Sequence, residues 1–214
     1  MEVNKIEIKV LSLSLASIIL IETAAHFITS LLLYPSLIFL GVVRFFETVQ
    51  MILIVIIWGK GIASIGLASS KMIPGFKKGL IWSVAIGLST TLAYGLLFGA
   101  GIHPMTFIRV HMPENQSDII LLFFIGGVIG PIAEEVFFRG ILYGFFRKWG
   151  LWMALVLSTL IFVAVHLDLT GFRLAQLAGG IIFAVSYELG GSLIAPITIH
   201  VLGNLAVYTL SLII

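Results

Sequence analysis

The chain of 214 residues contains no cysteine. This absence excludes disulfide bonds, thiolate metal ligands and a cysteine nucleophile. Charged residues are also scarce: they make up 10% of the chain, against 60% hydrophobic residues and a mean hydropathy of +1.18. The net charge of +2 is too small to suggest a nucleic-acid partner, so we expect none. A composition of this kind is that of an integral membrane protein, and it is incompatible with a water-soluble domain.

Apolar runs of about 20 residues recur from one end of the chain to the other, without the alternating pattern of a membrane β-barrel. We therefore predict an all-α integral membrane protein, a single membrane domain over 1–214 with about seven transmembrane helices, six to eight being the possible range. The first run is interpreted as a retained helix and not as a cleaved signal peptide. The predicted spans are Ile8–Leu33, Ser36–Trp58, Gly79–Gly101, Ile119–Phe146, Leu151–Leu167, Phe172–Tyr187 and Ser192–Ile213.

Basic residues are distributed unequally between the predicted loops. Eight fall on one side of the membrane: Lys5, Lys9, Lys60, Lys71, Lys77, Lys78, Arg147 and Lys148. Only Arg109 and Arg173 fall on the other side. Because cytoplasmic loops are enriched in Lys and Arg, we predict a multi-pass protein of the cell membrane with a cytoplasmic N-terminus. The longest cytoplasmic segment would be Gly59–Lys78, with Ile62, Ile65 and Ile73 lying along the membrane interface.

Two adjacent carboxylates and an arginine interrupt the fourth apolar run, in the stretch Gly130–Gly140. Ionisable groups at membrane depth are costly and are kept where they pair or do chemistry. Glu135 and Arg139 are four residues apart, share a helix face and stand in the favourable order for an ion pair. Glu134 lies roughly 140° from Arg139 around the helix axis. Glu134 is therefore the candidate for chemistry, and Glu135 and Arg139 are interpreted as its support.

Further polar residues lie in two later spans. Phe162 and His166 are four residues apart near the end of the fifth span, which predicts an aromatic wall one turn below the imidazole. His200 and Asn204 have the same spacing in the last span and project from one helix face. A carboxylate, two imidazoles and an amide that converge between helices could activate water and stabilise an oxyanion. Glu134, His166 and His200 could instead bind a metal such as zinc.

Other polar and small residues at helical spacing are interpreted as structural. The pairs Glu22 with His26 and Arg44 with Glu47 would line or brace the first two spans. Gly126 and Gly130 form a small-xxx-small pair suited to close helix packing. Pro131 and Pro196 each precede a polar cluster, where a kink could open the bundle.

These motifs, in this order and on separate apolar segments, resemble the CPBP family. This is the family of type II CAAX prenyl proteases and bacteriocin-processing enzymes, also called the Abi family. The resemblance rests on Glu134-Glu135-x-x-x-Arg139, Phe162-x-x-x-His166 and His200-x-x-x-Asn204, and it covers a catalytic core over 119–207. It implies an intramembrane endopeptidase with Glu134 as the base that activates water and His166 assisting. His200 and Asn204 would bind the oxyanion or orient that water, with Glu135, Arg139 and Phe162 in support.

The resemblance leaves the cofactor and the substrate open. Asn is a poor zinc ligand, so Asn204 favours a metal-free mechanism, while a divalent metal such as zinc held by Glu134, His166 and His200 is the alternative. The expected partners are the lipid bilayer and a peptide or protein substrate with a prenylated or otherwise hydrophobic C-terminus. Two other functions compete: a non-catalytic membrane scaffold or bacteriocin-immunity protein, and a proton-coupled transporter. The absence of an inverted repeat disfavours the transporter.

Overall fold

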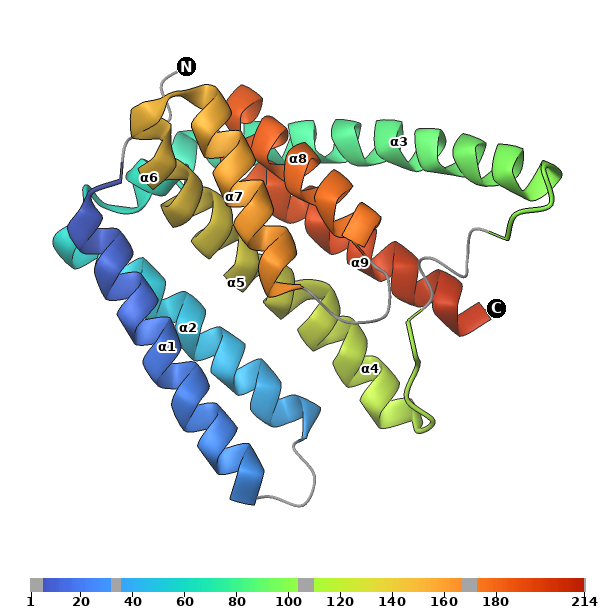
Figure 1. The fold of residues 1–214 in the computed structure, drawn as a ribbon, viewed down its shortest axis with the longest axis horizontal. Coiled ribbons are helices and arrows are strands. Elements are labelled where there is room, and N and C mark those ends of the chain that lie inside the picture. Colours follow the sequence, from blue (N-terminus) through green and yellow to red (C-terminus); the bar gives the residue numbers. More distant parts are fainter. Residues whose placement is uncertain (1–5, 32–35, 104–109, 167–172, 214) are drawn as a thin grey trace.

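The computed structural model describes residues 6–31, 36–103, 110–166 and 173–213, and the helices in these ranges form one bundle (Figure 1). The first three long helices are α1 (Ile8–Leu31), α2 (Leu37–Trp58) and α3 (Ser69–Gly99), with a 3₁₀ turn η1 (Ile62–Ile65) between α2 and α3. A continuous helical run follows, made of α4 (Gln116–Phe124), η3 (Ile125–Ile129), α5 (Gly130–Glu135), η4 (Val136–Tyr143), α6 (Gly144–Phe146) and η5 (Arg147–Trp149). The last three long helices are α7 (Leu151–Val165), α8 (Arg173–Gly190) and α9 (Ile194–Ile213).

This architecture confirms the predicted all-α membrane bundle of about seven helices; the described residues contain no strand. Five helical segments are long and apolar enough to cross a membrane: Ile8–Leu31, Leu37–Trp58, Ile62–Gly99, Gln116–Trp149 and Ile194–Ile213. Two shorter apolar helices, Leu151–Val165 and Leu174–Gly190, complete the bundle. The predicted ends of three spans, at Leu33, Leu167 and Phe172, lie outside the described residues.

The third span begins earlier than predicted, because the second half of the segment Gly59–Lys78 is helical and continues into α3. The helix α3 begins at Ser69, ten residues before the predicted Gly79, and runs through Pro74. This part of α3 packs along α9: a Cβ added at Gly79 would come within 2.6 Å of Thr198 Cβ. Ile65 was predicted at the interface but is fully buried against Gly140.

Polar groups tie the first two helices together within the membrane. Arg44 of α2 forms ion pairs with Glu22 of α1 and with Glu47 of its own helix, each at 2.6 Å. The predicted pairing of Arg44 with Glu47 is therefore present, and Glu22 pairs with Arg44 across the two helices. At the start of the chain, Ile6 N donates to Gly144 O at 3.2 Å, which anchors the beginning of α1 to α6. The α1–α2 hairpin is thus held to the central helical run at the end where α6 lies (Figure 1).

Candidate active site

The ion pair predicted between Glu135 and Arg139 is present, and it lies buried beneath the site. Arg139 Nη1 donates to Glu135 Oε1 at 2.8 Å, and the two side chains are 1% and 0% exposed. Arg139 Nη2 donates to the carbonyl of Gly180 in α8 at 3.3 Å. The guanidinium also lies over the rings of Phe162 and Phe183, 4.6 and 5.0 Å from their centroids. These contacts compensate the burial of a charge that would otherwise be very costly.

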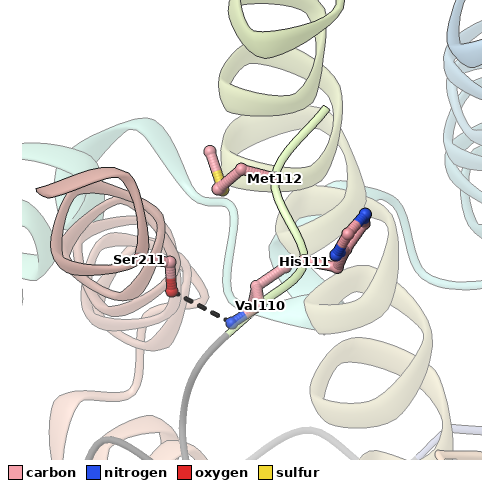
Figure 2. A pocket seen from close by; sticks show the side chains of 4 residues that line it. All are labelled: Val110, His111, Met112 and Ser211. Carbon is pink, nitrogen blue, oxygen red and sulfur yellow. Dashed lines mark hydrogen bonds between the residues drawn. The ribbon is translucent and has the colours of Figure 1, made fainter. Parts of the chain in front are cut away.

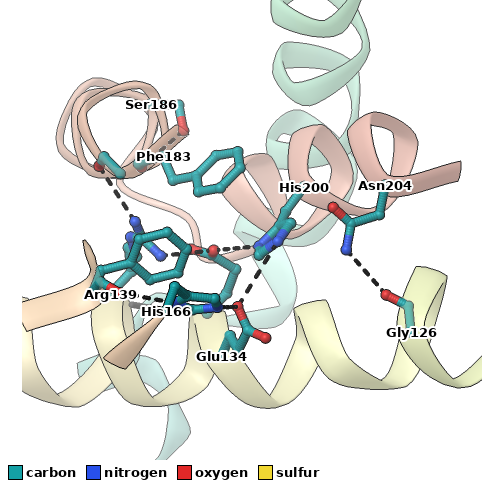
Figure 3. Close-up of polar contacts among 11 residues, drawn as sticks. Gly126, Glu134, Arg139, His166, Phe183, Ser186, His200 and Asn204 are labelled. Atoms are coloured by element: carbon teal, nitrogen blue, oxygen red, sulfur yellow. Dashed lines mark hydrogen bonds and ion pairs between the residues drawn. The ribbon is translucent and has the colours of Figure 1, made fainter. Parts of the chain in front are cut away.

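Glu134 points the other way, as the helical spacing predicted, and meets the two histidines from α7 and α9 (Figure 3). Its Oε2 lies 3.4 Å from His166 Nε2 and 3.9 Å from His200 Nε2. The side chains of Glu134 and His166 are each 29% exposed, whereas Glu135 is completely buried. The tertiary structure therefore brings Glu134, His166 and His200 together, and it separates Glu134 from the ion pair beneath it.

The partners of the other imidazole nitrogens fix where the hydrogens lie. His166 Nδ1 is 2.7 Å from the carbonyl oxygen of Phe162, which can only accept a hydrogen bond. His200 Nδ1 is 2.8 Å from Glu135 Oε1, a carboxylate oxygen already bound by Arg139. We therefore assign the hydrogen to Nδ1 in both rings, so each neutral ring has a lone pair on Nε2.

Three hydrogen-bond acceptors consequently converge at one point: Glu134 Oε2, His166 Nε2 and His200 Nε2. Glu134 Oε2 is buried and accepts no hydrogen bond from the described residues. Facing lone pairs in a buried site are unfavourable unless a donor lies between them. The arrangement therefore calls for a proton, a water molecule or a cation at the point that these atoms share.

Asn204 lies one helical turn beyond His200, as predicted, but its amide has a structural partner. Its Nδ2 donates to the carbonyl of Gly126 at 3.0 Å (Figure 3). In the π-helical segment η3, Gly130 N donates to Ile125 O, five residues back. The next donor in that pattern would be the nitrogen of Pro131, which carries no hydrogen. Asn204 thus supplies the donor that Gly126 O lacks.

Two aromatic rings shape the site around the histidines. Phe162 and His166 have ring centroids 4.4 Å apart, which places the predicted aromatic wall next to the imidazole. Phe183 of α8 stacks on His200, with centroids 4.4 Å apart and an angle of 18° between the planes. Phe183 was not among the predicted site residues, because it lies in none of the three motifs and reaches His200 and Arg139 through the packing of α8.

Small residues bring the two halves of the site close together. A Cβ added at Gly126 would lie 2.6 Å from the hydroxyl oxygen of Tyr208, and one at Gly127 would lie 2.7 Å from Leu205 Cδ2. Gly126 therefore serves the close helix packing predicted for it. Gly130 does not, because an added Cβ there would meet only the carbonyl of Ile125, in the preceding helical turn.

A separate cavity of about 520 Å³ lies at the C-terminal end of α9 (Figure 2). It is lined by Val110, His111, Met112 and Ser211, and Ser211 Oγ accepts a hydrogen bond of 3.0 Å from Val110 N. None of the predicted site residues lines it, so it is not the place of the candidate chemistry.

The three converging acceptors are atoms of the type that zinc binds. Their Nδ1 partners also resemble the outer contacts that orient metal-bound histidines. Nevertheless, no group of three or more His, Asp or Glu side chains among the described residues has metal-ligand spacing. The donor types at Glu134, His166 and His200 fit a divalent cation.

Comparison with known proteins gives similarities over the same region. The model of the family described as type II CAAX prenyl endopeptidase, Rce1-like, matches residues 116–206, which contain Glu134, His166, His200 and Asn204. The chain is 30% identical over 157 residues to a protein of Bacillus subtilis called putative membrane peptidase YdiL, covering 70% of this chain and 59% of that protein. It is 29% identical over 137 residues to the membrane-embedded CAAX protease MroQ of Staphylococcus aureus, covering 61% and 53% of the two chains.

An uncharacterized 24.3 kDa protein of Escherichia coli is 33% identical over 97 residues, covering 43% of this chain and 45% of that protein. The chain thus spans about half the length of the curated relatives it matches. No solved structure matches it.

Proposed function

Because residues 116–206 match the family of type II CAAX prenyl endopeptidases, we propose that the chain is a membrane-embedded endopeptidase in which Glu134 activates a water molecule. The observation that carries this proposal is the convergence of three acceptors, Glu134 Oε2 with the Nε2 atoms of His166 and His200, at 3.4 and 3.9 Å. A water molecule has two hydrogens, so it can donate to Glu134 Oε2 and to one of the two Nε2 atoms, while a lone pair on its oxygen stays free for attack.

The reaction then follows from the placement of the acceptors. Glu134 accepts a proton from the water as its oxygen bonds to the carbonyl carbon of the peptide. The second hydrogen of the water is donated to the Nε2 lone pair of His166 or of His200, which holds the water in place. The negative charge that develops on the carbonyl oxygen needs a donor, and the second amide hydrogen of Asn204 is the candidate. The carbon–nitrogen bond breaks as Glu134 returns its proton to the leaving amine.

Glu135 and Arg139 act through His200 and do not touch the substrate in this proposal. Glu135 Oε1 accepts from both Arg139 and His200, so it holds the imidazole in the tautomer with Nε2 toward Glu134. Holding a ring in one tautomer is how a buried carboxylate assists a catalytic histidine in other hydrolases. Phe162 and Phe183 fix the ring planes of His166 and His200.

A metal-dependent version uses the same residues. A divalent cation would be held by Glu134, His166 and His200, and it would polarise the carbonyl and acidify a bound water. The water-only version is our leading proposal, because Asn204, one helical turn beyond His200, is a poor zinc ligand.

The proposed substrate is a peptide or protein with a hydrophobic C-terminus, prenylated or not. The similarity to a membrane-embedded CAAX protease suggests this class. The purified protein in detergent should cleave such a peptide, and Glu134→Ala should abolish cleavage. A matched pair of peptides with and without the prenyl group decides whether the lipid is required. If Glu134→Ala kept full activity while Glu135→Ala lost it, the assignment of Glu134 as the base and of Glu135 as a supporting residue would be wrong.

Two further measurements separate the competing functions. If the protein were a scaffold or an immunity protein, the four candidate catalytic residues could be replaced without loss of phenotype as long as the protein folds. These residues are Glu134, His166, His200 and Asn204. A proton-coupled transporter would instead show flux in liposomes.

A further inference from the structure

We propose that Tyr208 is a further substrate-binding residue, whose hydroxyl donates a hydrogen bond to a backbone carbonyl of the peptide a few residues from the bond that is cleaved. This inference rests on the proposed peptidase function and adds a contact that none of the three motifs contains. It follows from the place of Tyr208 on α9, from the contacts that hold its ring, and from the surroundings of its hydroxyl.

Tyr208 continues the row of polar side chains that begins at His200. His200, Asn204 and Tyr208 are spaced by four residues within the continuous helix α9, so their side chains lie on one face. His200 lies beside Glu134, and Asn204 binds the carbonyl of Gly126. The next residue of the row therefore follows the same contact between α9 and the central helical run.

Two glycines make room for the ring of Tyr208 on the central run. A Cβ added at Gly126 would lie 2.6 Å from the hydroxyl oxygen, and one added at Gly127 would lie 3.8 Å from Cδ2 of the ring. Both glycines belong to the π-helical segment η3. Gly126 is also the residue whose carbonyl Asn204 binds, so the phenol and the amide contact the central run at the same point.

The ring is held in place by an aromatic neighbour. Phe123 of α4 packs against it with centroids 5.7 Å apart and an angle of 64° between the planes. Edge-to-face pairs of this kind fix the orientation of a ring, and a tyrosine side chain has only two torsions to fix. The hydroxyl of Tyr208 is therefore held at a defined position before any ligand arrives.

The hydroxyl of Tyr208 has no hydrogen-bond partner in the part of the chain that the structure describes. A phenol that packs between membrane helices normally finds one, because neither lipid tails nor an apolar helix face can supply it. The hydroxyl also lies within electrostatic range of the Glu134 carboxylate. A molecule that reaches Glu134 can thus reach this donor as well.

The chemistry of the site favours a peptide carbonyl as the partner of Tyr208. Glu134 Oε2 and the Nε2 atoms of His166 and His200 are all acceptors, whereas a peptide carbonyl needs a donor. The phenol hydroxyl supplies that donor. Because a carbonyl recurs at every residue of a peptide, this contact would bind an extended chain whatever its side chains are.

The position of Tyr208 sets how far from the cleaved bond the contact falls. Eight residues of α9 separate His200 from Tyr208, a rise of about 12 Å. Side chains on a helix lean toward its N-terminus, so the hydroxyl lies closer to His200 than this rise. An extended peptide advances about 3.3 Å per residue, so the contact falls about two to three residues from the cleaved bond.

Removing only the hydroxyl tests the contact. Tyr208→Phe keeps the ring against Phe123 and Gly127 and should raise KM by about threefold to tenfold, the worth of one hydrogen bond. The value of kcat should stay within about twofold, because a contact remote from the reacting atoms holds the ground state and the transition state alike. Tyr94→Phe is the matched control, since Tyr94 stacks on Phe98 within α3, and it should change neither constant. An unchanged KM in Tyr208→Phe would overturn the proposal.

Gly126 provides a second, coupled test. Gly126→Ala places a Cβ where the hydroxyl lies and should raise KM by a similar factor. In the double variant with Tyr208→Phe, the nearest other atoms lie 3.4 Å from that Cβ, an ordinary contact, so the second substitution should add no further loss. Losses that multiply in the double variant would show that the two residues act apart, and this would overturn the contact.

Shortened peptides locate the contact along the substrate. The assay peptide is trimmed from either end to a single residue beyond the cleaved bond. For one of the two trimmed peptides Tyr208→Phe should have no effect, because the carbonyl that the hydroxyl binds is gone. Full sensitivity to Tyr208→Phe in both trimmed peptides would overturn the proposed position.

Binding without turnover separates this inference from the peptidase function. A hydrophobic peptide labelled with a fluorophore should bind to the Glu134→Gln protein in detergent, and adding Tyr208→Phe should raise the Kd by about threefold to tenfold. A protein that binds this peptide through Tyr208 but cleaves nothing as wild type contradicts the peptidase function and keeps the inference. A protein that cleaves the peptide with the same KM in the wild type and in Tyr208→Phe does the reverse.

Discussion

Glu135 and His200 are 65 residues apart in sequence and share a hydrogen bond of 2.8 Å at the centre of the bundle. The same carboxylate oxygen accepts from Arg139 at 2.8 Å. Glu135 therefore has two roles: it neutralises a buried guanidinium and it fixes the tautomer of an imidazole that faces Glu134. The helical spacing predicted the first role, and only the packing of α9 on the central run revealed the second.

Glu134→Gln should reduce peptide cleavage by at least a thousandfold, because the amide cannot accept the proton of the attacking water. Its stability should hardly change, since Glu134 lies outside the buried ion pair and is partly exposed. Cleavage rate and melting temperature in detergent measure the two effects. Full activity in this variant would contradict the assignment of Glu134 as the base.

Glu135→Gln and Arg139→Met should lower the free energy of unfolding, by about 3–5 kcal/mol where one charge is left buried without its partner. Arg139→Met removes the cation and leaves Glu135 with His200 alone, so both stability and activity should fall. The double variant Glu135→Gln/Arg139→Met should recover part of the stability but not the activity, because His200 would still lack its carboxylate. Denaturant titration and the peptide assay provide the comparison; additive losses in the double variant would contradict the coupling.

Phe183→Leu should lower kcat by about tenfold with little change in KM, because it removes the ring that stacks on His200. Phe183→Tyr keeps the ring and should restore most of the rate. A matched control is Phe146→Leu, an aromatic-to-aliphatic change at the end of α6. Equal losses in the Phe183→Leu and Phe146→Leu variants would show that the effect is general destabilisation and not the positioning of His200.

Two glycines of α3 offer a matched test of its packing on α9. Gly79→Ala would place a Cβ 2.6 Å from Thr198 Cβ and 2.9 Å from the carbonyl of Ala195, so we expect a loss of about 1–3 kcal/mol from overpacking. Gly87→Ala meets nothing within 4 Å and should be neutral or stabilising, by up to about 1 kcal/mol, through helix propensity. Thermal unfolding in detergent compares the two. A smaller loss in Gly79→Ala than in Gly87→Ala would contradict this packing.

Metal removal separates the two versions of the mechanism. In the water-only version, the purified protein should contain less than about a tenth of an equivalent of divalent metal, and chelation should leave the cleavage rate unchanged. Elemental analysis and assays before and after dialysis against a chelator provide the measurement. Stoichiometric metal, with activity lost on chelation and restored by zinc, would establish the metal-dependent version.

The sequence by itself determined the class of the protein and most of the residues in question. Its hydropathy fixed a helical membrane bundle, because a backbone in lipid must satisfy its own hydrogen bonds. The spacing of Glu135 and Arg139 fixed their ion pair and directed Glu134 elsewhere, because i,i+4 neighbours share a face whatever the rest of the chain does.

Tertiary structure decided what no local pattern contains. The convergence of Glu134 with His166 and His200, the stacking of Phe183 and the second role of Glu135 depend on how separate helices pack. The early start of α3 depends on its packing along α9, where Gly75 and Gly79 allow a close approach. Asn204 depends on both the sequence and the tertiary structure. Its position on the same helix face as His200 follows from their spacing in sequence. Its hydrogen bond to the Gly126 carbonyl forms because Pro131 leaves that carbonyl without a backbone donor.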